Sequence, residues 1–168
     1  LVLELLSRNI FSEPPNSVTF VDSLVVPRKK LLTIVPYIYP FVSDIKNENF
    51  SDEHKKYWYS INPKEAMREL AILIKLVRNK LEQDIAFPEQ TTCQIFQATN
   101  DPVVDPQSAL LLYEGILLHD GRKPMLSMVE SDLHVFTRLS ARKKGLVTPN
   151  DRSRQYDVFE QIIRLSKQ

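Results

Sequence analysis

Residues 92–106 read TCQIFQATNDPVVDP, and residues 124–134 read PMLSMVESDLH. Each segment begins with β-forming residues and passes into polar residues that favour turns. Between the two, residues 107–118 read as a short helix. A strand–helix–strand crossover sets two parallel strands side by side, nearly always with a right-handed connection. The sequence therefore predicts an α/β fold built on a parallel sheet.

An acidic residue and a histidine follow these two strands. Asp101 comes just after the first strand and His134 just after the second. Loops that leave parallel strands at their carboxyl ends lie at the same end of the sheet, where open α/β sheets bind ligands. A carboxylate that accepts from one imidazole nitrogen fixes the tautomer and makes the other nitrogen a base. We therefore expect Asp101 and His134 to meet there as catalytic acid and base.

The rest of the chain divides into core segments and an insertion. A third parallel strand is expected over residues 17–26, where a nearly continuous apolar run is typical of a strand covered on both faces. Residues 27–87 are rich in proline and aromatic residues and read as a helical cap or lid. The predicted domains are thus a core of residues 1–26 and 88–168 and a lid of residues 27–87.

Three further helices are expected. Residues 1–9 have helical spacing, with Leu1, Leu5 and Leu6 on one side. The long helix over 63–83 has Asn62 as its expected N-cap, Glu65 to close a capping box, and an apolar stripe. That stripe consists of Ala66, Leu70, Leu73, Val77 and Leu81. Asp151 is expected to cap the last helix, whose packing face would hold Val158, Phe159, Ile162, Ile163 and Leu165.

Composition and charge exclude several classes of protein. The chain has 168 residues, which suits one domain, and its net charge of +1 gives no electrostatic basis for binding nucleic acid. No apolar run reaches the roughly 20 residues of a membrane helix. Glu4 and Arg8 interrupt the apolar start, which argues against a secretory signal. The single cysteine, Cys93, allows no internal disulfide and favours a cytoplasmic location.

At this point the chain resembles the C-terminal half of an α/β-hydrolase of the carboxylesterase, lysophospholipase and monoacylglycerol lipase kind. The resemblance is carried by residues 94–105 and 131–135, which match that family's strand–Asp–Pro–Val–Val and Ser–x–x–His–Val stretches. Residues 59–70 also resemble a lid helix of these enzymes. The resemblance implies that Asp101 and His134 are the acid and base of a catalytic triad, and that no cofactor is needed.

One departure from the family is decisive. Its nucleophile stands in Gly-x-Ser-x-Gly, whereas Gly115, Gly121 and Gly145 are the chain's glycines and no two are four apart. We therefore expect residues 1–9 to be the helix that follows the nucleophile elbow, with the serine and the oxyanion donors upstream of residue 1. The missing N-terminal half is then an expected partner, and self-pairing through an exposed strand edge is another expectation.

Several other residues have both a functional and a purely structural interpretation. Asp105 rivals Asp101 as the acid, but it precedes Pro106 in the manner of a helix cap. His119 and His54 read as surface histidines, so no metal site is expected. Cys93 reads as strand core and not as a nucleophile. Two aromatic sets, Tyr57–Tyr59 and Tyr37 with Tyr39, could line an acyl pocket or only pack the lid.

The expected function is hydrolysis of carboxylic esters or lipid-like acyl substrates by an intact protein, of which this chain alone would be inactive. Two alternatives remain open. One is a non-catalytic half-hydrolase that serves as a binding or scaffold module. The other is an epoxide- or haloalkane-type hydrolase, which would need an upstream aspartate in place of the serine.

Overall fold

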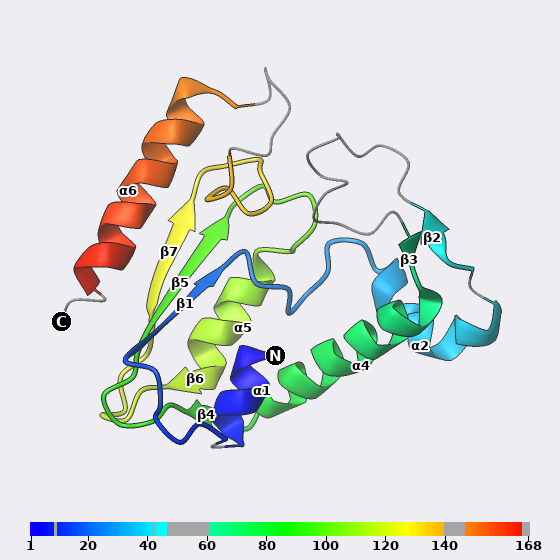
Figure 1. Ribbon diagram of the computed structural model, residues 1–168, viewed down its shortest axis with the longest axis horizontal. Coiled ribbons are helices and arrows are strands. Elements are labelled where there is room, and N and C mark those ends of the chain that lie inside the picture. Colours follow the sequence, from blue (N-terminus) through cyan, green and yellow to red (C-terminus); the bar gives the residue numbers. More distant parts are fainter. Residues whose placement is uncertain (9, 42, 47–60, 140–146, 166–168) are drawn as a thin grey trace.

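A three-stranded parallel sheet lies at the centre of the computed structural model, which describes residues 1–8, 10–41, 43–46, 61–139 and 147–165. The strands are β1 (Ser17–Val21), β5 (Thr92–Ala98) and β7 (Met125–Val129), in the spatial order β1–β5–β7 (Figure 1). The predicted α/β fold and its three parallel strands are confirmed, with boundaries that differ in places from the predicted ones.

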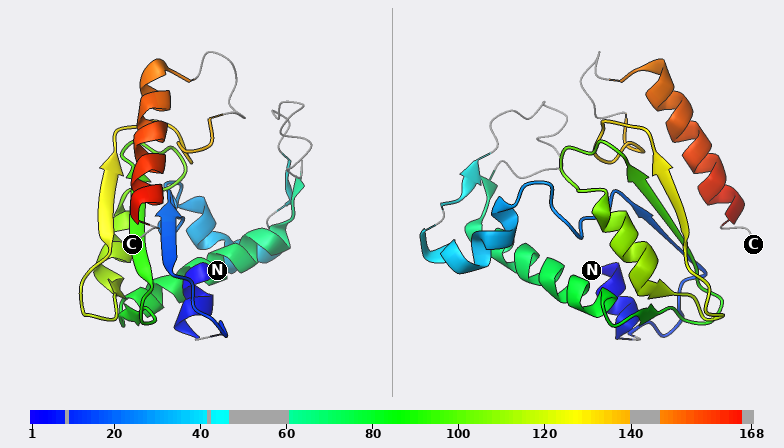
Figure 2. Two further views of the ribbon diagram at one scale, coloured as in Figure 1. Left: turned by 60° about the vertical axis from the view of Figure 1, so that its left-hand side comes forward. Right: turned by 180° about the vertical axis from the view of Figure 1, so that it is seen from behind.

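The central strand β5 is buried on both faces because helices cover both sides of the sheet. On one face, Cys93 and Ile95 belong to a core cluster with residues of α5 (Gln107–Gly115). On the other face, Phe96 and Ala98 pack with Val158 of α6 (Pro149–Leu165). Figures 1 and 2 show α5 and α6 on opposite sides of the strands. The carboxyl ends of β5 and β7 are therefore held from both sides.

Strand β1 is shorter and less covered than predicted. It ends at Val21 and not at residue 26, because Asp22 has a φ of 44° and turns the chain out of the sheet. Its side chains alternate, so that Val18 and Phe20 are buried while Thr19 lies half-exposed. Double-faced burial belongs to the central strand β5, whereas β1 is an edge strand of this sheet.

The first helix, α1, covers Val2–Ser7, so the predicted range of 1–9 is too long. Residue 9 lies outside the described residues. The buried side is formed by Leu3, Glu4 and Leu6, whereas Leu1 is exposed, so the predicted packing side is wrong by part of a turn. Glu4 forms ion pairs with Arg8 and, at 2.8 Å, with Lys80 of α4 (Lys64–Leu81). These charges join α1 to the long helix.

The segment between β1 and β5, called the insertion below, contains most of the remaining elements. Its elements are α2 (Leu31–Ile38), the 3₁₀ helix η1 (Tyr39–Phe41), β2 (Ile45–Lys46), β3 (Ile61–Asn62), α4 and β4 (Ile85–Ala86). Helices α2 and α4 pack against each other, β2 and β3 pair antiparallel, and β4 pairs in parallel with β6 (Ile116–Leu117). In Figure 1 the insertion extends away from the sheet on the side opposite α6.

The start of α4 is secured differently from the sequence prediction. Asn62 lies in β3 and is no cap, and the helix begins at Lys64, whose backbone N–H donates to the Asp44 carboxylate at 3.0 Å. The Glu65 carboxylate accepts instead from the Tyr39 hydroxyl at 3.0 Å. The capping acid thus comes from 20 residues away in the chain, which no local pattern could indicate.

The buried stripe of α4 is also displaced by about one position. Ala71, Ile74, Val77 and Leu81 are buried. The predicted stripe shares only Val77 and Leu81 with this set, and Leu70 is exposed. The reason is that α4 packs against both α2 and α5, which lie on a different side of the helix from the one that periodicity alone selects.

Two other helix ends differ from prediction. Helix α5 stops at Gly115 and continues as β6, where a side chain at residue 115 would collide with the Leu81 carbonyl oxygen. At α6, Thr148 acts as the cap: its hydroxyl accepts from the Asp151 N–H, while the Asp151 carboxylate accepts from Thr148. Asp151, in the first turn of α6, thus forms a reciprocal capping interaction with Thr148.

The packing face predicted for α6 is confirmed only in part. Val158 is buried and Ile162 packs against the same cluster, whereas Phe159 and Ile163 are exposed. Within the described residues, none of the helices is both long enough and apolar enough to cross a membrane.

Candidate active site at the carboxyl end of the sheet

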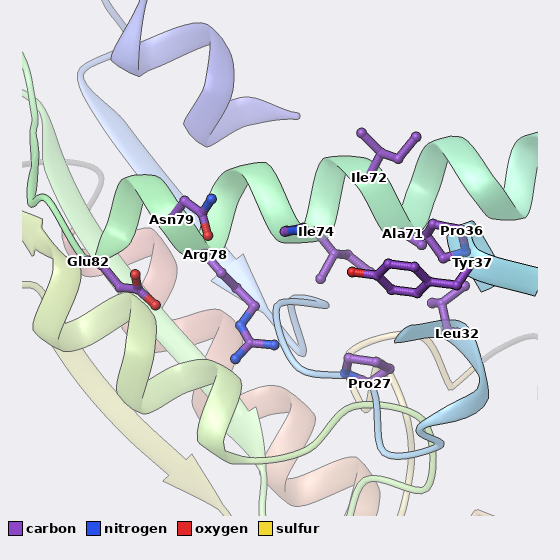
Figure 3. A pocket seen from close by; sticks show the side chains of 11 residues that line it. Pro27, Leu32, Pro36, Tyr37, Ala71, Ile72, Ile74, Arg78, Asn79 and Glu82 are labelled. Carbon is purple, nitrogen blue, oxygen red and sulfur yellow. The ribbon is translucent and has the colours of Figure 1, made fainter. Parts of the chain in front are cut away.

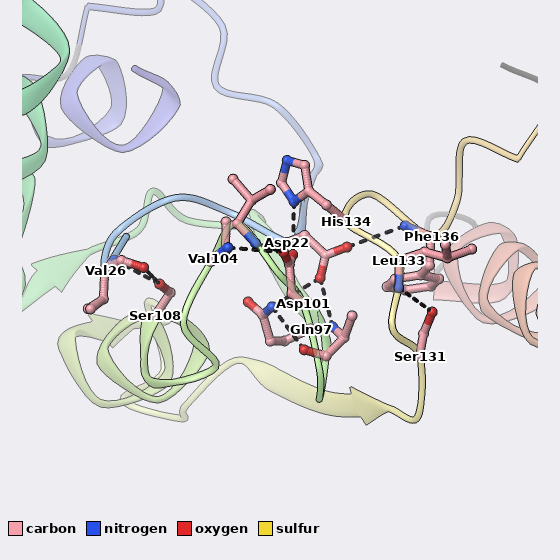
Figure 4. A network of polar contacts seen from close by, with 12 residues as sticks. Asp22, Val26, Gln97, Asp101, Val104, Ser108, Ser131, Leu133, His134 and Phe136 are labelled. Carbon is pink, nitrogen blue, oxygen red and sulfur yellow. Dashed lines mark hydrogen bonds and ion pairs between the residues drawn. The ribbon is translucent and has the colours of Figure 1, made fainter. Parts of the chain in front are cut away.

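Asp101 and His134 form the centre of the site. Asp101 Oδ2 and His134 Nδ1 are 2.8 Å apart, so the two residues meet at the carboxyl ends of β5 and β7 (Figure 4). The Asp101 side chain is completely buried, and the His134 side chain is 31% exposed. In Figure 4 the second ring nitrogen of His134 points away from the carboxylate. Such a pair can hold one imidazole tautomer while the ring still reaches solvent or a substrate.

The loop after β5 is shaped to hold the Asp101 carboxylate. Asp101 Oδ1 accepts from the backbone N–H groups of Val103 at 2.7 Å and Val104 at 3.0 Å. The same loop is tied to the segment after β1, because the Arg28 N–H donates to the Val103 carbonyl and Asp105 N–H to the Val26 carbonyl. With both oxygens engaged, the carboxylate has one well-defined orientation, with Oδ2 directed at the imidazole.

The turn from β5 to Asp101 is built without glycine. Among the described residues, those with positive φ outside glycine are Asp22, Asp84, Gln90 and Val135. Thr99 N–H donates to the Val129 carbonyl and Asn100 N–H to the Ser131 carbonyl. Ordinary backbone conformations, paired across to the histidine loop, are therefore sufficient in this turn.

The histidine loop is a tight structure of its own. The Leu133 N–H donates to the Ser131 hydroxyl at 3.2 Å. The Asp132 carboxylate accepts from the Asn100 side chain at 3.0 Å, which ties this loop to the loop that carries Asp101. Directly after His134, Val135 has a φ of 52°, an unusual conformation for a β-branched residue.

Asp22 is a third polar residue of the site, and the sequence interpretation missed it. It follows β1 at the same end of the sheet and is only 3% exposed. One oxygen or nitrogen atom each from Asp22, Asp101 and His134 lies within 4.8 Å of the others. A usable signal existed, because aspartate is disfavoured inside strands and marks the end of a strand at residue 22.

Burial raises the pKa of the Asp22 carboxyl, and the negative charge of Asp101 raises that pKa further. Backbone donors and the nearby His134 act in the opposite direction. The cluster of Asp22, Asp101 and His134 has the ligand types that a divalent metal could use. Its carboxylate oxygens, however, accept hydrogen bonds from protein donors.

The other candidate residues lie elsewhere. Cys93 is buried in β5, and burial raises the pKa of its thiol to about 12, which agrees with the predicted structural role. Asp105 is a helix-start acceptor as predicted, since its carboxylate accepts from Gln107 N–H at 3.0 Å. His119 is exposed at a turn, also as predicted. His54 and the aromatic set 57–59 lie outside the described residues.

A cavity of about 560 Å³ lies between α2 and α4 in the insertion (Figure 3). In Figure 3 its apolar side chains gather around α2 and the facing part of α4, while Arg78, Asn79 and Glu82 lie toward the end of α4. Tyr37 lines this cavity, whereas Tyr39 contacts Glu65 instead. Its apolar lining is formed by Pro27, Leu32, Pro36, Tyr37, Ala71, Ile72 and Ile74.

A second, more open groove of about 530 Å³ runs along β1. It is lined by residues of α1, β1, the following segment 23–25, α4 and α5, and nearly all of them are apolar. In the described part of the chain, β1 pairs with β5 alone, so its opposite side carries strand groups without a neighbouring strand. This is the exposed strand edge that the sequence interpretation expected on one side of the sheet.

Comparison with known proteins supports the fold. No family model and no curated protein matches the sequence. Among solved structures, one from a study of LipS and LipT, two metagenome-derived lipolytic enzymes, matches with a TM-score of 0.60 and 14% identity. The match covers 94% of this chain and 58% of that enzyme. The chain therefore has part of an α/β-hydrolase fold and spans little more than half the length of its lipolytic structural neighbour.

Proposed function

We propose that this chain supplies the acid and the base of a serine hydrolase that acts on carboxylic esters or lipid-like acyl groups. In this proposal His134 takes the proton of the attacking serine and later delivers it to the leaving group. Asp101 holds the imidazole in the required tautomer and stabilises its charged form. Water then releases the acyl group from the enzyme, and the chemistry needs no cofactor.

One observation carries the proposal: a buried carboxylate, fixed by two backbone donors, lies 2.8 Å from a partly exposed imidazole at the carboxyl end of a parallel sheet. A histidine whose only role was structural would have no need of a carboxylate oriented so completely. The lipolytic structural neighbour is consistent with ester hydrolysis at a coarse level.

The nucleophile belongs outside these 168 residues in this proposal, because the chain has no Gly-x-Ser-x-Gly. The groove along β1 is the surface on which we propose that the nucleophile-bearing part of the fold packs. Two features support this assignment: the groove has an apolar lining, and among the described residues no strand pairs with that side of β1. A strand added there would lie beside β1, whose own end brings Asp22 to the site.

The insertion is the proposed lid. Residues 27–87 would cover the site of a core formed by residues 1–26 and 88–168, and the cavity between α2 and α4 would receive the acyl chain. Its volume of about 560 Å³ lies in the range of small-molecule sites, which are concave and mostly apolar. Pro27, which lines the cavity, forms a bridge with Val104, which in turn donates to Asp101. One lining residue of the cavity is thus linked through the backbone to the loop that holds the acid.

The decisive experiment measures p-nitrophenyl ester hydrolysis by the full-length protein and its variants. His134→Ala and Asp101→Asn should each lower kcat by roughly 10³-fold or more, since an unsupported or absent base removes most triad catalysis. His119→Ala is the matched control and should leave kcat unchanged, because His119 is exposed at a distant turn. Equal rates for the His134 and His119 variants would refute the proposal.

A serine-directed fluorophosphonate probe separates the alternatives. The full-length protein should be labelled, and the 168-residue chain alone should not. Labelling that depends on none of the serines upstream would contradict the proposal. A protein that resists the probe but opens epoxides or haloalkanes would indicate an aspartate nucleophile. A protein with none of these activities would favour a binding module.

A further inference from the structure

We propose that Asp22 is a positioning residue of this site, which joins the end of β5 to the histidine loop and thereby sets the orientation of the His134 imidazole. This inference rests on the proposed function, because it assigns Asp22 a role in the same acid–base pair. Asp22 accepts hydrogen bonds from Gln97, Ala98 and Phe136. It acts through the backbone on either side of the pair (Figure 4).

The first half of this connection reaches β5. Asp22 Oδ1 accepts from the Ala98 N–H at 2.7 Å and from the Gln97 side-chain amide at 3.1 Å. Ala98 is the last residue of β5, three residues before Asp101. A short hydrogen bond to a carboxylate is among the stronger hydrogen bonds in proteins. Asp22 therefore fixes the point at which the chain leaves the sheet toward the acid.

The second half reaches the histidine loop. Asp22 Oδ2 accepts from the Phe136 N–H at 3.4 Å, two residues after His134. Val135, which lies between His134 and Phe136, has a φ of 52°, in the left-handed region. A β-branched residue stays in that conformation only where the surrounding structure holds it there. The Phe136 side chain is buried, and the bond to Asp22 holds its backbone, so the strained residue is held immediately on its C-terminal side.

The chemistry of the side chain matters as well as its shape. A carboxylate offers two oxygens and no donor, so it can accept from the two loops at once. An asparagine at residue 22 offers one oxygen, and its NH₂ group would face an N–H. Asp22→Asn therefore keeps the size of the side chain and removes one half of the connection.

Histidine NMR tests the inference without any need for ester turnover. In the wild-type protein we expect His134 as the Nδ1–H tautomer, with a strongly downfield Nδ1 proton. Asp22→Asn should shift that proton upfield or broaden it and should lower the population of the tautomer. Asp105→Asn is the matched control, because its carboxylate also accepts a backbone N–H but lies at the start of α5. The His134 signals should not change in that variant.

Kinetics of the full-length protein give a second measurement. Asp22→Asn should lower kcat roughly 10- to 100-fold, the size of effect expected when a reacting group is displaced from its aligned position. KM should remain within about twofold, because Asp22 is only 3% exposed and is therefore shielded from a substrate. A general loss of folded protein would instead lower the active fraction, which active-site titration measures.

If Asp22→Asn does not fold, a measurement on the wild-type protein still tests the inference. The carboxyl ¹³C signal of Asp22 can be followed with pH, and the groups that face it are Asp101 and His134. The Phe136 amide, which donates to Asp22, should move with the same midpoint as the Asp22 carboxyl. A Phe136 amide that ignores the Asp22 titration overturns the inference.

The outcomes also separate this inference from the proposed function. If Asp101→Asn leaves the His134 signals unchanged, the acid–base pair itself fails, and the proposed function fails with it. If Asp101→Asn abolishes the downfield proton while a folded Asp22→Asn retains both that proton and full kcat, only the role of Asp22 is wrong. Equal changes in the Asp22 and Asp105 variants would likewise overturn that role.

Discussion

The carboxyl end of the sheet and the helical insertion are built on opposite principles. At the sheet end, Asp22 and Asp101 are almost fully buried, and their carboxylates are held by backbone donors. In the insertion, Phe41 is 90% and Tyr37 75% exposed, and a cavity is lined by residues of both α2 and α4. The region that orients two side chains toward each other is buried, and its carboxylates have hydrogen-bond partners. A region suited to receiving apolar groups keeps apolar surface uncovered.

The comparison predicts that stability resides in the sheet. Phe96→Ala should destabilise the protein by about 3–5 kcal/mol, because Phe96 is completely buried between β5 and α6 and its loss leaves a cavity. Chemical denaturation monitored by circular dichroism measures the change. As a control in the insertion, Ile72→Ala should cost less than about 1 kcal/mol, because Ile72 is exposed on α4. Equal losses in the two variants would contradict the comparison.

The acid loop should be the next most sensitive place. Asp101→Ala should destabilise the fold by about 2–3 kcal/mol, because it leaves the buried N–H of Val104 and that of Val103 without their acceptor. Asp101→Asn should cost less, since an amide oxygen can still accept from those donors. The ordering of the two midpoints in urea checks the prediction. An alanine variant as stable as wild type would mean that the loop does not depend on its carboxylate.

The pH dependence of stability should report Asp22. Because burial raises its pKa above the ordinary 3.8, the folded protein holds this proton more tightly than the unfolded chain does. Asp22 thus contributes stability at low pH, and this contribution is lost as the pH rises through the raised pKa. Between about pH 3.5 and 7, the unfolding free energy of the wild type should therefore fall relative to that of Asp22→Asn as the pH rises. Parallel curves would show that Asp22 titrates normally.

The smallest effect on stability is expected in the insertion. Tyr37→Ala should change the unfolding free energy by no more than about 0.5 kcal/mol, because the side chain is largely exposed. It should nevertheless lower kcat/KM for long-chain esters by roughly 10-fold relative to short-chain esters if the cavity receives acyl chains. Tyr156→Ala, an exposed tyrosine on α6, is the control. An unchanged chain-length profile would separate the cavity from the reaction.

The same two regions differ in how far the sequence could predict them. Asp101 and His134 could be placed together because each follows a strand directly, and parallel strands end at one side of the sheet. The alternation of apolar and turn residues over 92–106 was enough for that argument. The two residues are 33 positions apart, but their contact follows from a general rule of chain topology, because each stands directly after one of two adjacent parallel strands.

Prediction failed where an element depends on a distant partner. Asp44 caps α4 from 20 residues away, so the nearby Asn62 was chosen wrongly. The buried stripe of α4 depends on where α2 and α5 pack, which periodicity does not contain. Asp22 was missed because valines and a leucine on both sides of it made residues 17–26 resemble one strand. Its contacts lie 76 residues away at Ala98 and 114 residues away at Phe136.

The burial of Cys93 has a practical consequence for studying these two regions. Its thiol is buried in β5, and with a pKa of about 12 it is almost entirely protonated at neutral pH. Maleimide reagents should therefore not react with it. A cysteine introduced on the surface of α4 and another on α6 could then be tagged selectively with spin labels. The wild-type chain is thus a suitable starting point for double electron–electron resonance, which would measure whether the insertion changes its distance from the sheet when an ester analogue is added.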